Sequence, residues 1–162
     1  MIIREERPAD HPALRALLEA AFGGPAEADL VDALRRDGDI AIALVAELEE
    51  GPAGHLVLSR MRAPPGTLGL APLAVKPSRQ GSGLGSALVE AGLARACSEG
   101  WQGVFVLGEP AFYGRFGFTA AQAAPFRSPF SGPFLQALEL RPGALAAKEP
   151  EAAYAAAFAA FE

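Results

Sequence analysis

The sequence predicts a single α+β (mixed α/β) domain in which helices flank a mixed sheet. The chain has 162 residues, a length typical of one domain with its own core. Hydrophobic residues make up 51% and charged residues 20%, as in globular rather than disordered proteins. Strand-like runs alternate with helical patterns, and neither an internal repeat nor a long linker divides them. We therefore expect residues 1–162 to form one domain.

The first predicted elements are a short strand and two helices. Ile2-Ile3 followed by charge indicates the strand. Asp10 is expected to cap a helix, because leucine and alanine follow it at helical spacing until Gly23-Gly24-Pro25 breaks the pattern. A second helical pattern begins at Ala26 and ends at Arg35-Arg36, where cations suit the helix dipole.

Three strands are expected next. Ile40–Glu47 is a buried run, and after a turn His55–Met61 is expected to return antiparallel to it. Thr67–Val75 is predicted to be the third strand, although Pro72 interrupts it. A proline inside a strand implies a bulge or an unpaired backbone group.

The second half of the chain predicts further helices and strands. A helix is expected from the glycine-rich stretch to Gly100, followed by a buried strand at Val104–Leu107. The remaining predicted elements are a short helical turn at Ala111–Arg115, a strand that Phe116-Gly117-Phe118 leads into, a last strand at Leu135–Leu140, and an Ala-rich C-terminal helix over residues 150–162 with Tyr154, Phe158 and Phe161 on one face.

Charge and composition exclude several classes of function. The net charge of −5 and the pI of about 5.1 leave no large basic patch, so neither nucleic acid nor a membrane surface is expected as a partner. The single cysteine, Cys97, excludes a disulfide framework and a cysteine-based zinc site, and with only two histidines no metal is expected. The N-terminus lacks a secretory apolar core, and no apolar run is long enough to span a bilayer. We expect a cytoplasmic protein.

The segment Leu73–Val89 carries the strongest chemical signal, because it predicts a strand, a glycine-rich turn and a helix in succession. The glycines within Gly81–Gly85 allow positive φ and bring bare backbone N–H groups close to a ligand. The helix N-terminus adds free donors and a partial positive charge, which together make an anion site suited to a pyrophosphate. Arg79 or Lys76 is a candidate cation at its rim.

Two other phosphate-binding patterns fail on spacing. The Walker A pattern requires Gly-Lys-Ser/Thr, whereas Gly85 is followed by Ser86 and Ala87. The dinucleotide fingerprint requires Gly-x-Gly-x-x-Gly after a first strand, whereas the spacing here is Gly81-x-Gly83-x-Gly85 in mid-chain. A nucleotide-dependent transferase is therefore a weaker alternative.

Two motifs resemble those of a known family. Gln80-Gly81-Ser82-Gly83-Leu84-Gly85 resembles the Arg/Gln-x-x-Gly-x-Gly/Ala signature of the GNAT-type N-acetyltransferase superfamily. Phe112–Phe118 is similar to the Tyr-x-x-x-Gly-Phe motif of the same family, and the two motifs stand in the family's order. The resemblance covers residues 2–141 and is closest to small bacterial acetyltransferases with Gly-His in the third strand, here Gly54-His55. One departure is that Val106–Ala111 lacks the Asn that many members place before the Tyr.

The resemblance implies both a fold and a reaction. The fold is a GNAT-like central mixed, mostly antiparallel sheet of about six or seven strands flanked by helices. The reaction is acetyl-CoA-dependent transfer of an acetyl group to an amine by direct attack on the thioester, without a metal. In the family's pattern, Tyr113 is the catalytic acid that protonates the leaving thiolate, and the N–H groups of Leu73 and Val75 hold the thioester carbonyl. The cofactor-binding residues that the resemblance implies are Leu73, Ala74, Val75, Arg79, Gln80, Gly81, Ser82, Gly83, Leu84, Gly85 and Ser86.

The sequence leaves several points open. The general base is Glu47, His55, Glu109, Glu139 or a water molecule, although His55 fits a hydrogen-bonded structural histidine better. The acceptor is a small-molecule or protein amine, and the aromatic loop Phe126–Phe134 is a candidate wall for it. A non-catalytic CoA-binding sensor or partner module on the same fold is the alternative function. Whether the C-terminal helix packs within one chain or between the subunits of a homodimer is also open.

Overall fold

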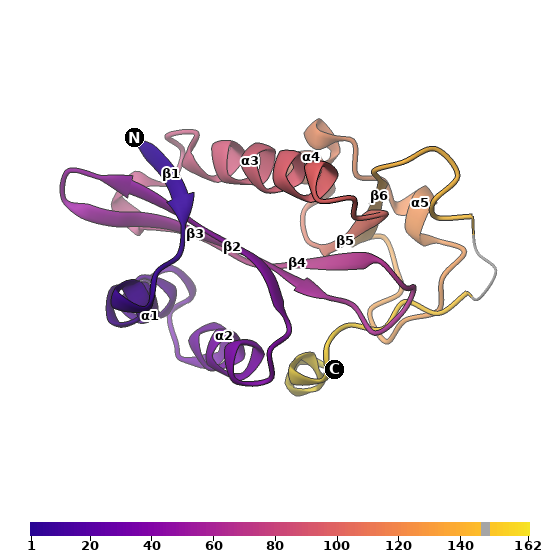
Figure 1. Cartoon of the computed structure of the whole chain (residues 1–162), viewed down its shortest axis with the longest axis horizontal. Helices are drawn as coiled ribbons and strands as arrows, with labels where there is room; N and C mark the ends of the chain where they lie inside the picture. Colours follow the sequence, from indigo (N-terminus) through magenta and orange to yellow (C-terminus); the bar gives the residue numbers. More distant parts are fainter. Residues whose placement is uncertain (147–149) are drawn as a thin grey trace.

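The computed structural model describes residues 1–146 and 150–162, and its centre is a mixed sheet flanked by helices (Figure 1). Within these ranges, six strands lie side by side in chain order. They are β1 (Ile2–Glu5), β2 (Ile40–Leu48), β3 (Gly51–Arg60), β4 (Thr67–Val75), β5 (Gly103–Leu107) and β6 (Leu135–Glu139). Every neighbouring pair is antiparallel except β4 and β5, which are parallel. The predicted mixed, mostly antiparallel sheet is confirmed.

Helices cover both faces of this sheet. Helices α1 (His11–Phe22) and α2 (Ala26–Arg36) lie on one face with the C-terminal 3-10 helix η4 (Ala156–Phe161), and α3 (Leu84–Ser98) and α4 (Pro110–Tyr113) lie on the other (Figure 1). The remaining short helices are η1 (Pro8–Asp10), η2 (Pro77–Arg79), η3 (Gly114–Phe116) and α5 (Ala120–Ala123). None of the helices in the described ranges is long and apolar enough to cross a membrane.

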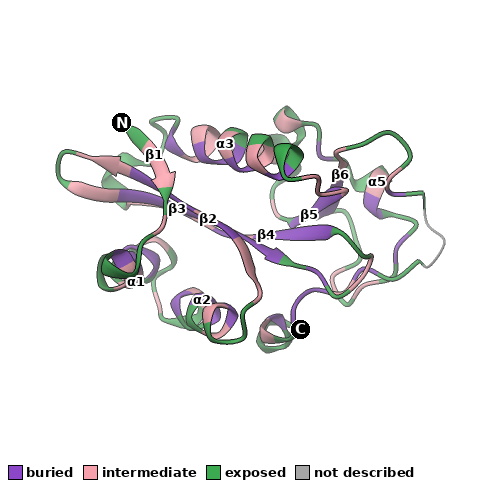
Figure 2. Ribbon diagram, viewed as in Figure 1, coloured by how far each residue is buried: buried purple, intermediate pink, exposed green. Residues whose placement is uncertain are grey.

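Each face of the sheet has its own apolar layer. Leu14 of α1 and Leu34 of α2 are fully buried in one layer, and Leu88 of α3 is fully buried in the other. Since side chains alternate along a strand, Val57 of β3 belongs to the α1/α2 layer and Leu56 to the α3 layer. Figure 2 shows that buried residues concentrate on the strands and on the inward sides of the helices. The sheet therefore separates the molecule into two faces with different helices.

The sheet opens between β4 and β5. Strand β4 pairs with β5 only as far as Leu70. On its other side, Ala71 and Pro72 together oppose the single residue Val57 of β3, so the register shifts there. The predicted bulge at Pro72 is confirmed, and beyond it the last residues of β4 have β3 as their only strand partner among the described residues.

The prediction of a strand after Phe116-Gly117-Phe118 is wrong. Gly117 adopts a left-handed conformation with φ of 99°, and the chain then makes only the isolated bridge between Thr119 and Ala137. The Thr119 hydroxyl accepts a hydrogen bond from the Gln122 N–H and caps α5. A local cap thus replaces strand pairing after Phe118.

The C-terminal helix is shorter than the predicted range 150–162. It is a 3-10 helix that begins at Ala156. Before it, the Ala152 N–H donates to the Arg127 carbonyl at 2.9 Å and the Ala153 N–H to the Ala63 carbonyl at 2.8 Å. These donors are used by loop pairing, so tertiary contacts outweigh the helix propensity of alanine. The tail packs on its own chain, because Tyr154 and Phe158 belong to the buried α1/α2 layer.

Asp10 stands at the predicted start of α1 but does not cap it with its side chain. Its carboxylate instead accepts from the Arg7 N–H at 2.7 Å and from the Arg4 guanidinium at 2.8 Å. Arg4 also donates to Glu47 on β2 at 2.7 Å. Asp10 therefore fixes the turn before the helix to strands β1 and β2.

Candidate active site

The opening between β4 and β5 exposes backbone donors of β4. The Lys76 N–H donates to the Ala53 carbonyl on the β3 side at 2.8 Å. Because successive N–H groups of a strand alternate in direction, those of Leu73 and Val75 point to the opposite edge, where β5 no longer pairs. The Val75 carbonyl on that edge accepts a hydrogen bond from the Gln80 side chain at 3.2 Å.

The glycine-rich turn supplies a second group of donors. Gly81 and Gly83 have φ of 78° and 88°, conformations that glycine adopts without strain, and no described atom lies within 4 Å of a Cβ placed on either. Within the described residues, the backbone N–H groups of residues 81–86 donate to no protein acceptor. The turn leads directly into the N-terminus of α3. Free N–H groups at a helix N-terminus form an anion-binding site.

A pocket lies over these donors, and we call it the glycine-loop pocket. Its lining residues are Leu73, Val75, Arg79, Gln80, Gly81, Gly83, Leu84, Gly85, Ser86, Phe112 and Arg115. It therefore collects most of the cofactor-binding residues that the sequence predicts. Ala74 and Ser82 are not among its lining residues. Ala74 is buried in the α1/α2 layer, and the Ser82 hydroxyl donates to the Arg79 carbonyl.

Two arginines stand at the rim of the glycine-loop pocket. Arg79 donates to a Glu50 carboxylate oxygen at 2.6 Å, and this hydrogen bond holds the pKa of Glu50 below its usual range. Arg115 donates to the Ser86 hydroxyl at 3.0 Å and lies 4.8 Å from the centre of the Phe112 ring. The sequence prediction included Arg79 and missed Arg115. The signal for Arg115 was its place in the Tyr-containing motif, two residues after Tyr113.

Tyr113 ends α4 at the other side of the opening. Its ring packs edge-on against Phe112 and Phe118, with centroids 4.9 and 5.8 Å away. A Cβ on Gly108 would lie 2.5 Å from this ring, so the glycine makes room for it. Burial raises the pKa of the Tyr113 hydroxyl to about 12, and no described residue hydrogen-bonds to that hydroxyl. The phenol is thus a protonated donor with a free bonding position.

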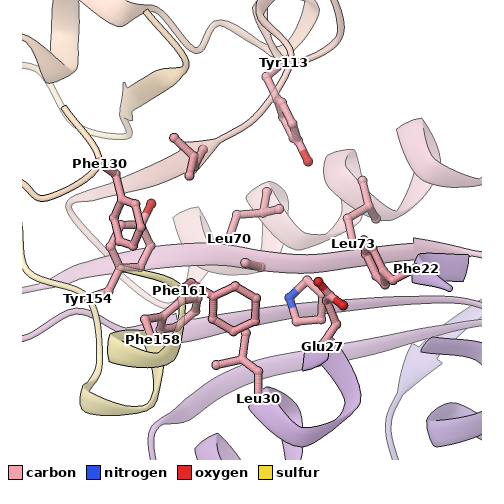
Figure 3. Close-up of a pocket in the computed structure, with 13 residues that line it drawn as sticks. Phe22, Glu27, Leu30, Leu70, Leu73, Tyr113, Phe130, Tyr154, Phe158 and Phe161 are labelled. Carbon is pink, nitrogen blue, oxygen red and sulfur yellow. The ribbon is translucent and has the colours of Figure 1, made fainter. Parts of the chain in front are cut away.

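A second pocket, the aromatic pocket, has a volume of about 230 Å³. Figure 3 shows its walls, which come from α1, α2, β4, β5, α4, the loop after α5 and the C-terminal tail. The lining residues are Phe22, Glu27, Leu30, Leu70, Ala71, Pro72, Leu73, Leu107, Tyr113, Phe130, Tyr154, Phe158 and Phe161. Leu73 lines both pockets, and the adjacent Phe112 and Tyr113 line one each. The two pockets therefore meet at the opened end of β4.

Glu27 is the one charged residue that lines the aromatic pocket among the described residues. It lies in the first turn of α2, and sequence analysis did not single it out. The sequence predicts that Glu27 lies in a helix. It does not predict that this helix and β4 line the same pocket. Figure 3 shows the Glu27 carboxylate beside Leu73 and Phe22, on the other side of β4 from Tyr113.

The predicted general bases lie outside both pockets. His55 is fully buried, and its Nε2 lies 2.8 Å from a Glu6 carboxylate oxygen, as expected of a structural histidine. Glu47 pairs with Arg4, and Glu139 accepts from the Gly143 N–H. Glu109 precedes α4 and is exposed. None of these residues is positioned to contact a ligand in the aromatic pocket.

The aromatic loop predicted as an acceptor wall contributes one residue. Phe130 lines the aromatic pocket, whereas Phe126 is buried against Phe105 and Phe134 is exposed outside the pocket. The C-terminal tail contributes more, because Tyr154, Phe158 and Phe161 all line it. The face of the tail that the sequence marked as aromatic thus becomes a wall of this pocket.

The fold and the site together define an acyl-transferring enzyme, with an opened strand between an anion-binding turn and an apolar pocket. A family model described as Acetyltransferase (GNAT) domain matches residues 39–120. The chain belongs to the GNAT family of N-acetyltransferases. No cluster of metal-binding side chains occurs in the part of the chain that the structure describes.

Two bacterial relatives are similar over nearly the whole chain. The uncharacterized N-acetyltransferase YhbS of Escherichia coli (strain K12) is 40% identical over 136 residues, which cover 82% of this chain and 81% of YhbS. The solved structure of YhbS from Escherichia coli in complex with CoA has a TM-score of 0.91 and 36% identity, and covers 99% of this chain and 93% of that chain. A GNAT family acetyltransferase from Brucella melitensis, solved in complex with acetyl-CoA, has a TM-score of 0.81 and 34% identity, with 97% of each chain covered.

Proposed function

We propose that the chain binds acetyl-CoA in the glycine-loop pocket and transfers the acetyl group to an amine that enters the aromatic pocket. The observation that carries this proposal is that the two pockets meet at Leu73, beside Tyr113 and the opened end of β4. The complexes of the two similar proteins with CoA and acetyl-CoA support the choice of cosubstrate.

The glycine-loop pocket has the donors that a pyrophosphate requires. The free N–H groups of residues 81–86 and the N-terminus of α3 suit its negative charge. Arg115 is fixed by Ser86 and Phe112 at the rim, where it can pair with a phosphate oxygen. Arg79 is held by Glu50 and is therefore partly neutralised. We assign the larger cationic contribution to Arg115.

The opened strand has the donors that acyl transfer requires. The N–H groups of Leu73 and Val75 would hold the thioester carbonyl and stabilise the negative charge that its oxygen develops during attack. The amine attacks the carbonyl carbon, a C–N bond forms, and the C–S bond breaks. Tyr113 donates its proton to the departing sulfur. The proton lost by the amine passes through solvent and restores the Tyr113 phenol.

The phenol and the sulfur share the same surroundings, which makes this proton transfer reasonable. Burial disfavours both a phenolate and a thiolate, so the pKa of the leaving thiol rises together with that of Tyr113. A donor with a pKa near 12 can therefore protonate a desolvated thiolate, although it would be a weak acid toward one in water.

Calorimetric titration of acetyl-CoA, CoA and ATP tests the cosubstrate. We expect acetyl-CoA and CoA to bind, and Gly83→Val to weaken binding at least about a hundredfold, because it places a side chain over the free N–H groups at φ of 88°. Gly38→Val is the matched control, since Gly38 has φ of 75° and lies outside the glycine-loop pocket. Circular dichroism checks that both variants fold.

The outcome separates the alternatives. Binding of ATP without CoA would overturn the proposal in favour of a nucleotide-dependent transferase. Tight CoA binding without turnover of any amine would identify a non-catalytic CoA-binding module. The remaining proposals are that residues 1–162 act as one domain and that the protein works in the cytoplasm, which the use of acetyl-CoA and the free, exposed Cys97 support.

A further inference from the structure

We propose that the acceptor is a small primary amine with a compact apolar body and a single cationic group, and that Glu27 binds its ammonium. This inference rests on the acetyltransferase function proposed above and adds the class of acceptor. Three features of the aromatic pocket carry it: its apolar walls, its one carboxylate and its size.

The walls favour an apolar ligand. Among the described residues, six large apolar side chains are exposed, and three of them line this pocket. These are Phe22, Leu107 and Phe161, with exposed fractions of 43%, 48% and 40%. Such side chains gathered around one hollow indicate a binding surface for apolar groups. Phe158 and Tyr154 continue the wall inward, where both are buried.

Glu27 selects one positive charge. Its carboxylate forms no ion pair with any described residue, although ten other carboxylates in the described part of the chain do so. Because it is the single charged group in a pocket of aromatic rings, it would attract an ammonium ion there. A second cationic group on the ligand would have no carboxylate partner inside the pocket. Polyamines therefore fit this site less well than monoamines.

The size of the pocket favours a small molecule over a protein. A volume of about 230 Å³ is below the range of about 300–1,000 Å³ that is usual for small-molecule sites. The tail forms one wall, because Phe158 and Phe161 of η4 line the pocket beside Leu30 of α2 (Figure 3). A folded protein would have to thread an extended terminus or a lysine past this wall.

The chemistry of the pocket agrees with an ammonium at Glu27. An amine attacks only as the neutral base, so the bound ammonium must first lose one proton. Glu27 accepts that proton directly or through one water molecule and passes it to solvent. The nitrogen lone pair then forms the C–N bond as described above. Glu27 lies on the α2 side of β4 and Tyr113 on the α4 side (Figure 3). The proton acceptor and the proton donor would therefore lie on opposite sides of a carbonyl group held by the N–H groups of β4.

A comparison of acceptors tests the proposal. Purified full-length protein with saturating acetyl-CoA is given phenylethylamine and hexylamine as apolar monoamines, spermidine as a polyamine, and a lysine-containing peptide with a free N-terminus. Mass spectrometry of the acetylated product and release of free thiol report turnover. We expect kcat/KM for an apolar monoamine to exceed that for spermidine or the peptide at least about tenfold, which corresponds to about 1.4 kcal/mol.

Matched variants connect the preference to the pocket. Phe161→Ala is expected to raise KM for phenylethylamine about tenfold, whereas Phe134→Ala, which removes an exposed ring outside the pocket, leaves KM unchanged. Glu27→Gln is expected to raise KM, lower kcat, and shift the rise of kcat/KM with pH to higher pH. Glu90→Gln is the control, because Glu90 is exposed on α3 and lines neither pocket.

Different outcomes would overturn the inferred acceptor class and the proposed acetyltransferase function. If acetyl-CoA does not bind, the acetyltransferase proposal itself is overturned. If acetyl-CoA binds and spermidine or the peptide is acetylated while no apolar monoamine is, the inferred acceptor class is overturned and the function stands. Equal effects of Phe161→Ala and Phe134→Ala would likewise overturn it, because the pocket wall would then contribute nothing to recognition.

Discussion

Tyr113, the proton donor that we propose, is surrounded by neighbours that carry no charge. Its ring is packed between Phe112 and Phe118 and lies against Gly108, and burial alone raises the pKa of its hydroxyl. A group whose pKa is raised stays protonated to higher pH, so Tyr113 remains a proton donor over the whole neutral and mildly alkaline range. The surroundings favour an acid here and exclude a base.

Tyr113→Phe is expected to lower kcat about a hundredfold while leaving acetyl-CoA affinity unchanged, since it removes only the proton donor. In the wild type, kcat/KM should rise with pH as the amine loses its proton and should not fall again below about pH 11, because the donor titrates near 12. Steady-state kinetics across pH, with calorimetry of acetyl-CoA binding, checks both statements. A decline of activity between about pH 8 and 10 would exclude Tyr113 as the acid, because its phenol would still be protonated there.

At the scale of the elements, Asp10 and Arg4 join the turn before α1 to the edge of the sheet. Both side chains are largely buried, with exposed fractions of 11% and 13%, and their closest N–O distance is 2.8 Å. The hydrogen bond from Arg4 lowers the pKa of Asp10 from its ordinary value of 3.8 to about 2. Its folded pKa is below its unfolded pKa, so this carboxylate stabilises the fold above about pH 4 and loses that effect as pH falls toward 2.

Asp10→Asn is expected to lower the free energy of unfolding by about 1–3 kcal/mol at pH 7, because Arg4 and the Arg7 N–H lose a charged acceptor. The difference from wild type should shrink as pH falls from about 4 toward 2, where wild-type Asp10 becomes protonated. Urea unfolding at several pH values measures it. Asp29→Asn is the control, since that carboxylate is 65% exposed and its pairing with Arg15 is worth little. A penalty that stays constant down to pH 2 would contradict the assignment.

The elements also show which structural features a sequence carries locally. Pro72 predicted a bulge, and the glycines of the turn predicted a helix start with free donors, because both depend on the backbone chemistry of adjacent residues. The C-terminal tail was predicted as a longer helix, because alanine favours helices locally while its N–H groups find Ala63 and Arg127 only in the folded chain. Glu27 was not predicted as a site residue for the same reason, because only the tertiary fold brings residues of α2 and β4 into one pocket.

At the scale of the whole molecule, the two pockets meet only at the opening of the sheet, where Leu73 lines both. The glycine-loop pocket is built by the end of β4, the glycine-rich turn, α3 and α4, and the aromatic pocket by the middle of β4 with α1, α2, β5 and the tail. Substitutions that change amine recognition, such as Phe161→Ala, should therefore leave acetyl-CoA affinity intact. Under the proposed function, amine specificity could then change without loss of the cosubstrate.

Binding at the opening should also stabilise the entire fold. A ligand in the glycine-loop pocket would contact β4, the N-terminus of α3 and the segment from Phe112 to Arg115. The ligand would bridge β4 to this segment at a level where β4 and β5 no longer pair, since their pairing ends at Leu70. At a concentration one hundred times Kd, a ligand that binds only the folded state adds about 2.7 kcal/mol, and for a chain of this length each kcal/mol raises Tm by about 2–4 °C. We expect acetyl-CoA to raise Tm by about 5–10 °C in a thermal-shift measurement. Gly83→Val should lose this shift and Gly38→Val should keep it, because only the first substitution blocks the free N–H groups of the turn. A shift retained in Gly83→Val would mean that acetyl-CoA binds elsewhere on the molecule.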